Sequence, residues 1–391
     1  MTAERPHLDP ERQLQAKVYS RLRRRVGLLE MALGLAYLVS WIETGAAVSL
    51  SGRISQAIPS AWPVSLVLMA AALGVPWFLI TLPFGYYAGF SLPHRFGQST
   101  QSIGGWLIDL AKSLGVGACL GIPLLVGLYA IMGAWPDTWW ATAGIGYLAF
   151  AVVLSILAPI VLMPLFNRFR PLADERADLA GRLMRLSEAA GRRVRGVYSF
   201  DMSRRTKSAN AALVGLGRTR RIVLGDTLLD EFPSDEIEAV LAHELGHHVH
   251  GDIPLGVLAG AGVMLANLWI ADAVLAEAAA SGALTGPTDP AGLPILLLVF
   301  SLMGFLVGPL ENAYSRWRER RADAFSVELT RRPRAFADAM TRLANQNLAD
   351  ADPPHWVVIL FGTHPPLRER IHFAEAVATA SGNKAGGVEA T

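Results

Sequence analysis

The stretch Val240-Leu241-Ala242-His243-Glu244-Leu245-Gly246-His247-His248 places two imidazoles and a carboxylate at a spacing with a chemical meaning. Residues four apart share one face of a helix, so His243 and His247 can bind one metal ion together. Glu244 projects beside them, close enough to take a proton from a water molecule held by that metal. The pattern therefore predicts the centre of a zinc hydrolase.

The residues around this stretch predict a helix independently of the motif. Ser234 is a suitable N-cap, acidic residues occupy the first turn, and an apolar stripe leads to an end near Gly251. Two histidines at this spacing are usually ordinary polar residues of a surface helix. The intervening glutamate and the small Gly246 favour a metal site instead. We expect His248 and His250 to point away from it, as interfacial or solvated residues.

The composition indicates a membrane protein rather than a soluble globule. Hydrophobic residues make up 52% of the 391 residues and charged residues 17%, with a mean hydropathy of +0.34. The single cysteine, Cys119, lies in an apolar run, which excludes a disulfide framework and a thiolate metal cluster. A metal must then be bound by histidine and carboxylate, and one zinc ion is the expected cofactor. We expect a lipid bilayer and a peptide or protein substrate as partners, and no nucleic acid.

Six apolar stretches are long enough to cross the hydrocarbon core. They are residues 26–50, 62–92, 103–133, 139–163, 255–280 and 291–313. Arg53 is the only basic residue in the connections at 51–61, 134–138 and 281–290. The N-terminus, residues 164–253 and the segment after 314 are instead rich in arginine. The positive-inside rule therefore predicts that both termini and the active site face the cytoplasm.

The remaining segments predict a catalytic domain in two pieces. We expect a basic N-terminus at 1–25, spans one to four within 26–163, a catalytic domain with the zinc-binding helix at 164–253, spans five and six within 254–313, a C-terminal part of the catalytic domain at 314–380, and a disordered tail at 381–391. The first catalytic piece should contain a helix at 172–190 and strands at 194–200, 211–216 and 221–224. The second should contain helices at 314–330, 333–347 and 367–379.

The fold class that follows is a mainly α, polytopic membrane protein. Its spans would form a bundle or barrel, and its catalytic part a small α+β domain like that of the zincins. Gly85-x-x-x-Gly89 and Gly117-x-x-x-Gly121 would allow close approach of helices. Asp109 and Lys112, one turn apart, would lie at the cytoplasmic interface or pair with each other.

A catalytic zinc site needs a third protein ligand and one open position. The candidates are Glu311, Glu319, Asp323, Glu328 and His364. Glu319 stands out because Asp323 follows it by four residues on one helix face. One carboxylate could bind metal while the other orients a ligand histidine. Without the His243 motif, this arginine-rich and glutamate-rich segment would be interpreted as a surface helix with ion pairs; with it, we favour the ligand.

Several further blocks occur in a characteristic order along the chain. They are Leu82-Pro83-Phe84, Pro164-Leu165-Phe166-Asn167, Ser208-Ala209-Asn210-Ala211, the His243 motif, Ser315-Arg316 with Glu319 and Ala322-Asp323, and His364-Pro365-Pro366-Leu367 with Glu369-Arg370. With these blocks the chain resembles the integral-membrane zinc metalloproteases typified by type I CAAX prenyl protease, whose relatives include bacterial heat-shock membrane proteases.

The resemblance implies roles for particular residues. Glu319 would be the third zinc ligand, Asp323 would position a ligand histidine, and His364 would stabilise the oxyanion. Asn210, Ala211 and Ala212 would belong to an edge strand that aligns the substrate peptide by β-augmentation. The family trims C-terminal tripeptides and processes prenylated peptides. Its eukaryotic members resemble a seven-span barrel around a chamber and carry an acidic insertion before the zinc-binding helix, which this chain lacks.

Other functions stay open at this point. An abundance of alanine, arginine and glycine indicates a bacterial plasma-membrane protein, where prenylated substrates are not expected; a eukaryotic source would place it in the endoplasmic reticulum membrane. A quality-control protease is therefore an alternative. A non-proteolytic zinc-binding scaffold or transporter is another, although a structural zinc normally has four protein ligands. A transporter would need paired charges within the spans, for which the candidates are Glu30, Glu43, Asp272 and Glu277.

Overall fold

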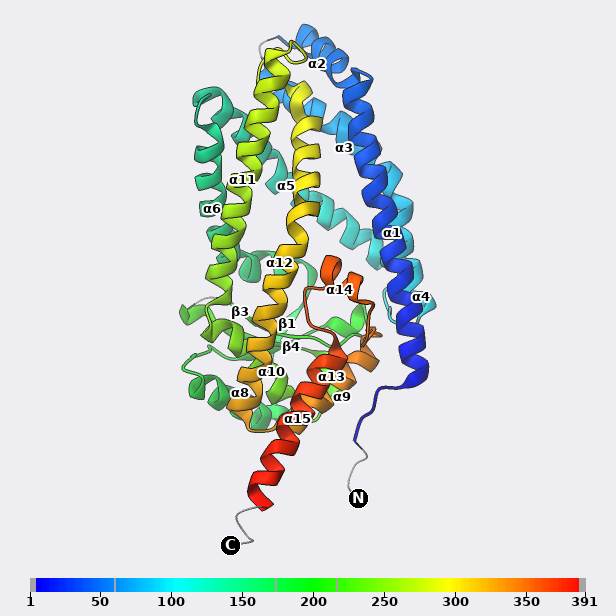
Figure 1. Ribbon diagram of the computed structural model, residues 1–391, viewed down its shortest axis with the longest axis vertical. Helices are drawn as coiled ribbons and strands as arrows, with labels where there is room; N and C mark the ends of the chain where they lie inside the picture. The colour runs from blue at the N-terminus through cyan, green and yellow to red at the C-terminus, as the bar shows by residue number, and fades with distance from the viewer. Residues whose placement is uncertain (1–4, 60, 173, 216, 387–391) are drawn as a thin grey trace.

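Six helices run side by side along the long axis of the molecule, and a small sheet lies near one end of them (Figure 1). The computed structural model describes residues 5–59, 61–172, 174–215 and 217–386. Within these residues, six helices are long and apolar enough to cross a membrane. The first and last described segments both lie at the end that holds the sheet (Figure 1). The prediction of a mainly helical, multi-pass membrane protein is therefore confirmed.

The candidate spans match the predicted stretches closely. They comprise α1 (Pro10–Glu43); α3 (Trp62–Tyr86), which continues through a π-helical turn (Tyr87–Ser91) into α4 (Leu92–Arg95); α5 (Ile103–Ala134); α6 (Trp139–Leu157), which continues through a second π-helical turn (Ala158–Leu162) into α7 (Met163–Phe166); α11 (Asp252–Ala280); and α12 (Leu293–Thr330). Pro76 and Pro83 lie inside α3, because a proline within lipid kinks a helix more readily than it ends one.

The first span differs from the prediction at both ends. The helix already begins at Pro10, where the Asp9 side chain accepts hydrogen bonds from the backbone N–H groups of Glu11 and Arg12. It ends at Glu43, because Gly45 takes a left-handed conformation with φ of 66°. A separate short helix, α2 (Ala46–Ala57), follows it. The basic residues before the apolar stretch are therefore part of the spanning helix.

The sheet has four strands in the order β1-β2-β4-β3. They are β1 (Phe169–Pro171), β2 (Val197–Phe200), β3 (Ala211–Val214) and β4 (Arg221–Gly225). The pair β2 and β4 is parallel, and the other two pairs are antiparallel. Three of the strands were predicted, although the last predicted residue of one, Leu216, lies outside the described residues. The three-residue β1 was not predicted.

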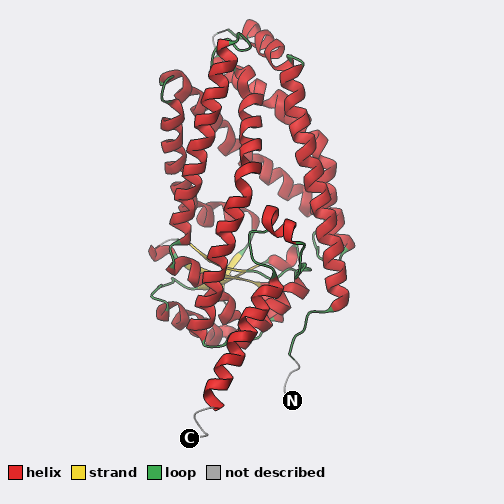
Figure 2. Ribbon diagram, in the orientation of Figure 1, coloured by secondary structure: helices red, strands yellow, loops and turns green. Residues whose placement is uncertain are grey.

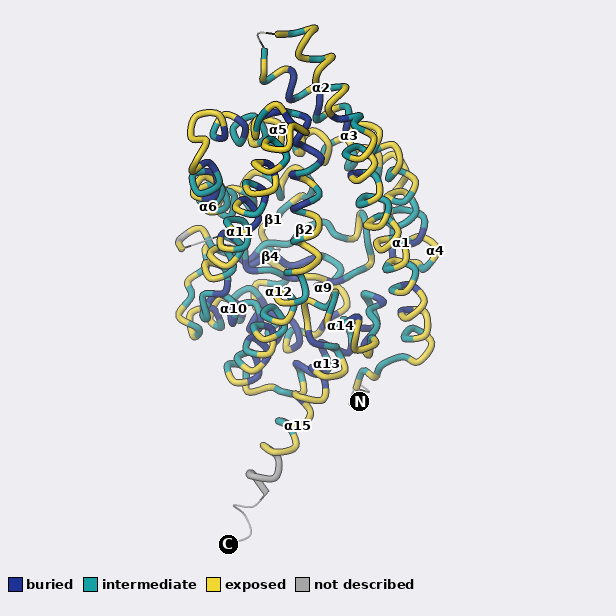
Figure 3. The backbone as a smooth tube through the Cα atoms, turned by 45° about the horizontal axis from the view of Figure 1, so that its top comes forward, coloured by how far each residue is buried: buried dark blue, intermediate teal, exposed yellow. Residues whose placement is uncertain are grey.

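Helices pack around the sheet and enclose the larger of the buried cores (Figures 2 and 3). They are α8 (Ala177–Ala189), α9 (Asp226–Glu231), α10 (Ser234–Val249), α13 (Pro333–Gln346) and α15 (Leu367–Gly386). The short helix α14 (His355–Phe361) lies between α12 and α1 in Figure 1. Short 3-10 turns occur at Asp174–Arg176, Met202–Arg204, Gly217–Thr219 and Pro290–Gly292. The helices α9 and α14 were not predicted. A disordered tail was predicted from Ser381, but α15 runs to Gly386, and residues 387–391 lie outside the described residues.

A second core closes the opposite end of the spans. Trp139 is fully buried there among residues of α3, α11 and α12, and its indole Nε1–H donates to Asp272 Oδ1 over 2.5 Å. Asp289, in the connection between α11 and α12, accepts a hydrogen bond of 2.9 Å from Ser51 Oγ. Asp272, one of the four acidic residues considered for a transporter, thus forms a fixed contact between two spans.

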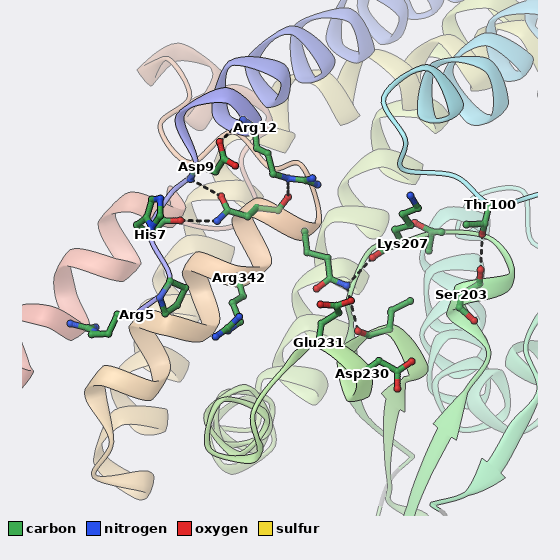
Figure 4. A pocket seen from close by; sticks show the side chains of 15 residues that line it. Arg5, His7, Asp9, Arg12, Thr100, Ser203, Lys207, Asp230, Glu231 and Arg342 are labelled. Carbon is green, nitrogen blue, oxygen red and sulfur yellow. Dashed lines mark hydrogen bonds between the residues drawn. The ribbon is translucent and has the colours of Figure 1, made fainter. Parts of the chain in front are cut away.

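The segment with His7, Asp9 and Arg12 (Figure 4) is tied to α13 through Asn345. The Asn345 side chain accepts from Asp9 N–H at 3.1 Å and donates to the His7 carbonyl at 2.8 Å, while Arg12 Nε donates to the Asn345 carbonyl at 2.7 Å. A pocket of 680 Å³ lies between this segment and the loop that contains Lys207. None of its lining residues belongs to the predicted metal site.

Candidate metal centre

The helix α10 is held on several sides before any metal is considered. It packs against α12, α13, α8 and β3. It begins at Ser234 with Pro233 as its N-cap, so the predicted N-cap was wrong by one residue. A Cβ atom at Gly246 would lie 3.0 Å from Ala322 Cα of α12. The glycine is therefore required for the close approach of α10 and α12, which brings the residues of the two helices together.

Three side chains from these two helices converge. His243, His247 and Glu319 each offer one ligand atom, and these atoms all lie within 4.8 Å of one another. The two Nε2 atoms are 3.3 Å apart, and the carboxylate oxygens of Glu319 lie 3.2 Å from His243 Nε2 and 3.3 Å from His247 Nε2. Glu311, Glu328 and His364 are not members of this group of ligand atoms.

Each histidine is oriented by a carboxylate behind it. His243 Nδ1 lies 2.9 Å from Asp323 Oδ1, and His247 Nδ1 lies 2.8 Å from Asp252 Oδ2. When each Nδ1–H donates to its carboxylate, both Nε2 lone pairs face Glu319. Glu319 Oε2 is a buried oxygen that accepts no hydrogen bond. Two ring nitrogens and a carboxylate oxygen thus converge on one point, which fits a divalent cation with an N, N, O ligand set.

Sequence reasoning did not assign two of the supporting residues. Asp252 is the first residue of α11 and follows Gly251, whose left-handed φ of 70° turns the chain back toward the histidines. The turn signal at Gly251, with an acidic residue after it, could have identified Asp252. Arg370 of α15 is buried and donates to both oxygens of Asp323, from Nε at 2.9 Å and from Nη2 at 2.6 Å. Arg370 belongs to one of the sequence blocks that carry the family resemblance, but the sequence alone assigned no role to it.

The electrostatics of the site favour a positive charge at the histidines. Burial disfavours protonation of His243, but the neighbouring carboxylates of Asp323 and Glu319 outweigh burial and raise its pKa to about 9. The pKa of His247 is also raised, because its contacts with Glu319 and Asp252 outweigh burial. The carboxylates that stabilise an imidazolium would stabilise a metal cation in the same way. Burial raises the pKa of Glu244, the adjacent carboxyl group.

Glu244 and His364 lie near the cluster without belonging to it. Glu244 and His247 line a pocket of 510 Å³, whose other walls include Leu213 of β3, Tyr147 of α6 and Gly256 of α11. The pocket therefore joins the candidate metal site to two of the candidate spans. His364, in the loop after α14, has its Nε2 3.4 Å from Glu319 Oε1. Its Nδ1 lies 2.9 Å from Thr363 Oγ1.

The strand β3 lies at an edge of the sheet, and its backbone is divided between two directions. Gly225 N–H donates to the Asn210 carbonyl at 2.9 Å, and the antiparallel register then turns Asn210 and Ala212 toward β4. The backbone groups of Ala211 and Leu213 consequently face the free edge. Of the three predicted substrate-binding residues, only Ala211 directs its backbone away from the sheet.

Side chains cap the free edge on both sides of Ala211. Asn347 accepts from Ala209 N–H at 2.7 Å and donates to the Ala209 carbonyl at 3.1 Å. His248 Nε2 lies 3.0 Å from the Leu213 carbonyl. His248 is therefore a buried structural contact, and its predicted interfacial or solvated position was wrong. His250 packs edge-on against Phe325, with ring centroids 5.7 Å apart.

The predicted pair on α5 is also arranged differently. Asp109 accepts from Arg205 at 2.6 and 3.0 Å, while Lys112 Nζ donates to the Leu165 carbonyl at 2.8 Å. Asp109 thus contacts the loop between β2 and β3, and Lys112 contacts α7 at the end of the fourth candidate span, so the two residues do not pair with each other. Charge-assisted bonds from Arg205, in the loop between β2 and β3, join this loop to a span.

Comparison with known proteins places this geometry in a family. The sequence model described as Peptidase family M48 matches residues 173–378, and the one described as "CAAX prenyl protease N-terminal, five membrane helices" matches residues 3–168. Within the described part of that second region, the chain has four candidate spans and the short helix α2. Together the two matches extend over most of the chain.

Individual relatives agree with the family matches. The chain is 29% identical over 372 residues to a Bacillus subtilis (strain 168) protein named "Uncharacterized metalloprotease YhfN", covering 94% of this chain and 86% of the relative. It is 30% identical over 308 residues to the CAAX prenyl protease 1 homolog of Arabidopsis thaliana, covering 75% and 70%. The crystal structure of S. mikatae Ste24p has the same fold, with a TM-score of 0.83, 24% identity and coverage of 95% and 92%.

Proposed function

The chain belongs to peptidase family M48, and from this premise we propose that it hydrolyses peptide bonds at one zinc ion held by His243, His247 and Glu319. It is a multi-pass membrane metalloprotease of the CAAX prenyl protease type. The observation that carries the ligand assignment is the convergence of two Nε2 atoms and one unsatisfied carboxylate oxygen, with Nδ1 of each histidine on a further carboxylate. When bound, zinc would polarise the scissile carbonyl and lower the pKa of water toward neutrality.

Glu244 is the proposed general base. It follows His243 directly on α10 and lines the pocket that also includes His247. Its carboxylate takes the proton of the attacking water and returns it to the leaving amine. Burial raises its pKa, which moves the carboxyl group toward the range where it both accepts and releases a proton. Asp252 and Asp323 act through the histidines, because they fix which ring nitrogen is protonated.

His364 is the proposed donor to the oxyanion. Thr363 Oγ1–H can donate to His364 Nδ1 over 2.9 Å, which leaves the proton of the neutral ring on Nε2. This Nε2 lies on the side of Glu319. A hydrogen bond donated from there would stabilise negative charge on the scissile carbonyl oxygen.

The substrate is proposed to be an extended peptide that reaches the site from the membrane side. Support comes from the pocket beside Glu244, which has walls from α6 and α11, and from Ala211, whose backbone faces the free edge of β3 next to α10. Relatives named CAAX prenyl protease 1 make prenylated peptides one candidate substrate. The bacterial relative that spans more of this chain is named only as a metalloprotease, so a quality-control protease without prenylated substrates is the second candidate.

We also propose a bacterial plasma membrane, with the active site on the cytoplasmic side. The sheet, α10 and both described ends of the chain lie at the same end of the molecule (Figure 1). The arginine-rich segments belong to that end, which the positive-inside rule assigns to the cytoplasm.

The test combines metal analysis with hydrolysis of quenched fluorescent peptides, prenylated and unprenylated, by the detergent-purified protein. We expect Glu244→Gln to keep its zinc and lose activity by about 10²- to 10⁴-fold, the usual contribution of general acid–base catalysis. His243→Ala should lose both zinc and activity. Wild-type activity in the Glu244→Gln variant would refute the mechanism. Preference for prenylated peptides would identify a prenyl protease, and equal cleavage of both peptides a quality-control protease.

A further inference from the structure

Four basic side chains on one face of α1 line a pocket outside the catalytic site. Lys17, Arg21, Arg24 and Arg25 form one wall of this cavity of 420 Å³. Their spacing places them within a third of the helix circumference. Ala16 and Tyr19 occupy the other face of the helix, where they are buried against Leu92 and Leu348. The fold therefore directs these four cations into one place.

The four cations are not neutralised by ion pairs within the described residues. None of them forms an ion pair or a hydrogen bond with a described residue. The opposite wall contains two carboxylates, Asp350 and Asp352, against the four cations, and Asp352 also lies beside Arg368. Asp350 Oδ1 accepts from the backbone N–H of Asp352, and Asp352 Oδ2 lies 3.6 Å from Arg368 Nε. The pocket consequently presents an excess of positive charge.

The remaining lining residues are apolar. Leu28, Pro354 and Trp356 complete the pocket. The guanidinium of Arg24 lies 6.0 Å from the centre of the Trp356 ring, and half of the tryptophan surface, 51%, is exposed. Cations at one side and an exposed tryptophan with leucine at the other match an amphipathic ligand, with a negative head and a hydrocarbon tail.

The position along α1 matches the surface of a membrane. The last of the four cations, Arg25, is followed directly by Val26, where the apolar part of the candidate span begins. The basic side chains therefore lie at the depth of the lipid phosphates, and Leu28 at the start of the hydrocarbon region. A juxtamembrane cluster of this kind attracts anionic lipids.

We propose that this pocket binds the phosphate headgroup of one anionic phospholipid, with its acyl chains against Leu28 and Trp356. The lipid would bridge α1 and α14, which lies between α1 and α12 in Figure 1. This site is independent of the metal centre and of the proposed hydrolytic function.

The binding test uses the full chain with its metal, purified in a neutral detergent. The thermal unfolding midpoint is followed while phosphatidylglycerol is added to the micelles, and the half-saturating lipid fraction is determined. Phosphatidylcholine and glycerol phosphate serve as the zwitterionic lipid and as the headgroup without chains. We expect saturable stabilisation by phosphatidylglycerol only. Equal stabilisation by phosphatidylcholine would overturn the anionic specificity, and equal stabilisation by glycerol phosphate would replace the lipid with a small anion.

The variants separate a built site from general attraction to a basic helix. Arg21→Gln and Arg24→Gln should each raise the half-saturating fraction about fivefold, the loss expected for one basic side chain at an anionic surface. Arg23→Gln is the matched control, because Arg23 lies over Tyr19 and does not line the pocket. It should change the fraction less than twofold. If Arg23→Gln weakened binding as much as Arg24→Gln, the site would be refuted.

Two further substitutions distinguish charge from folding. Arg24→Lys retains the cation and should bind within about threefold of wild type. Trp356→Leu removes the ring beneath Arg24 and should weaken binding about two- to fivefold. Full loss of binding in the lysine variant would contradict a site that recognises a phosphate by charge.

Discussion

The helix α10 and the helix α6 show opposite relations between sequence and burial. The metal-binding α10 carries charged and polar residues, yet ten of its 16 residues are buried, including Glu236, His243 and His248. The span that contains α6 is strongly apolar, yet none of its most apolar 18-residue window is buried inside the protein. In α10 the three histidines His243, His247 and His248 each contact a fixed polar partner, whereas the apolar side chains of α6 are available to lipid.

This difference separates the two ways in which the molecule is stabilised. Around the sheet, apolar burial and paired charges define where each atom lies. Among the spans, hydrocarbon lipid can replace protein as the apolar surrounding, so only the few points where helices touch are sensitive to sequence. Changes near α10 should therefore be costly when they leave a charge without its partner, and changes in α6 only where it contacts α11.

The largest effect is expected from the buried ion pair behind His243. Replacing Arg370 with Met keeps much of the volume but leaves the buried Asp323 without its two strongest donors. Removing one partner of a buried pair destabilises a protein by about 3–5 kcal/mol. We expect a fall of this size in the free energy of unfolding of the catalytic part, measured by chemical denaturation in detergent.

Arg368 provides the matched control for this prediction. It lies two residues away in the same helix, is 47% exposed, and is 3.6 Å from an exposed Asp352. Exposed pairs contribute about 0–1 kcal/mol. Arg368→Met should therefore be nearly neutral, and equal losses for the two variants would contradict the distinction between buried and exposed charge.

A smaller effect is expected behind the second histidine. Asp252→Asn weakens the acceptor at Oδ2, which lies 2.8 Å from His247 Nδ1, so the ring is less firmly oriented and less basic. Loss of such a supporting contact typically lowers metal affinity 10- to 100-fold. Zinc competition with a chelator measures this change directly. Glu277→Gln, at the other end of the same helix, should leave zinc affinity unchanged; a matching loss there would assign the effect to net charge.

How much of this arrangement the sequence predicts depends on whether a feature is local. The periodicity of a helix determines that residues four apart share a face, which brought His243 and His247 forward as a pair and favoured Glu319, four residues before Asp323, among five candidates. The family resemblance then gave Glu319 its role as third ligand. Hydropathy is a local signal as well, and it located the six spans. The partners Arg370 and Asn347 depend on tertiary packing between distant segments, so no local pattern identified them. Asp252 lies only five residues after His247, and the turn at Gly251 could have identified it.

Short elements were missed for a related physical reason. The three residues of β1 include Pro171 and gain their strand conformation by pairing with β2, which local propensity does not reveal. The glycine motifs were wrong in part as signals of close helix contact. A Cβ atom at Gly85, Gly117 or Gly121 would have no neighbour within 4 Å, whereas Gly89 lies near Trp106. Their spacing alone does not specify a partner helix.

The closest glycine contact between two spans is instead at Gly144, which tests the other half of the comparison. A Cβ atom there would lie 2.2 Å from Leu265 Cδ2 and 2.8 Å from its Cγ, but 3.9 Å from its Cα. The backbones of α6 and α11 therefore have room, and only the end of the leucine side chain must move. Overpacking usually costs about 1–3 kcal/mol, so we expect Gly144→Ala to lower the free energy of unfolding by about 1 kcal/mol.

Gly146→Ala is the control for this prediction. The new atom has no neighbour within 4 Å, and the variant should be neutral or slightly stabilising, since alanine favours a helix. Thermal unfolding midpoints of the two variants in one detergent give the difference; equal midpoints would mean that α6 and α11 are not in contact at this position.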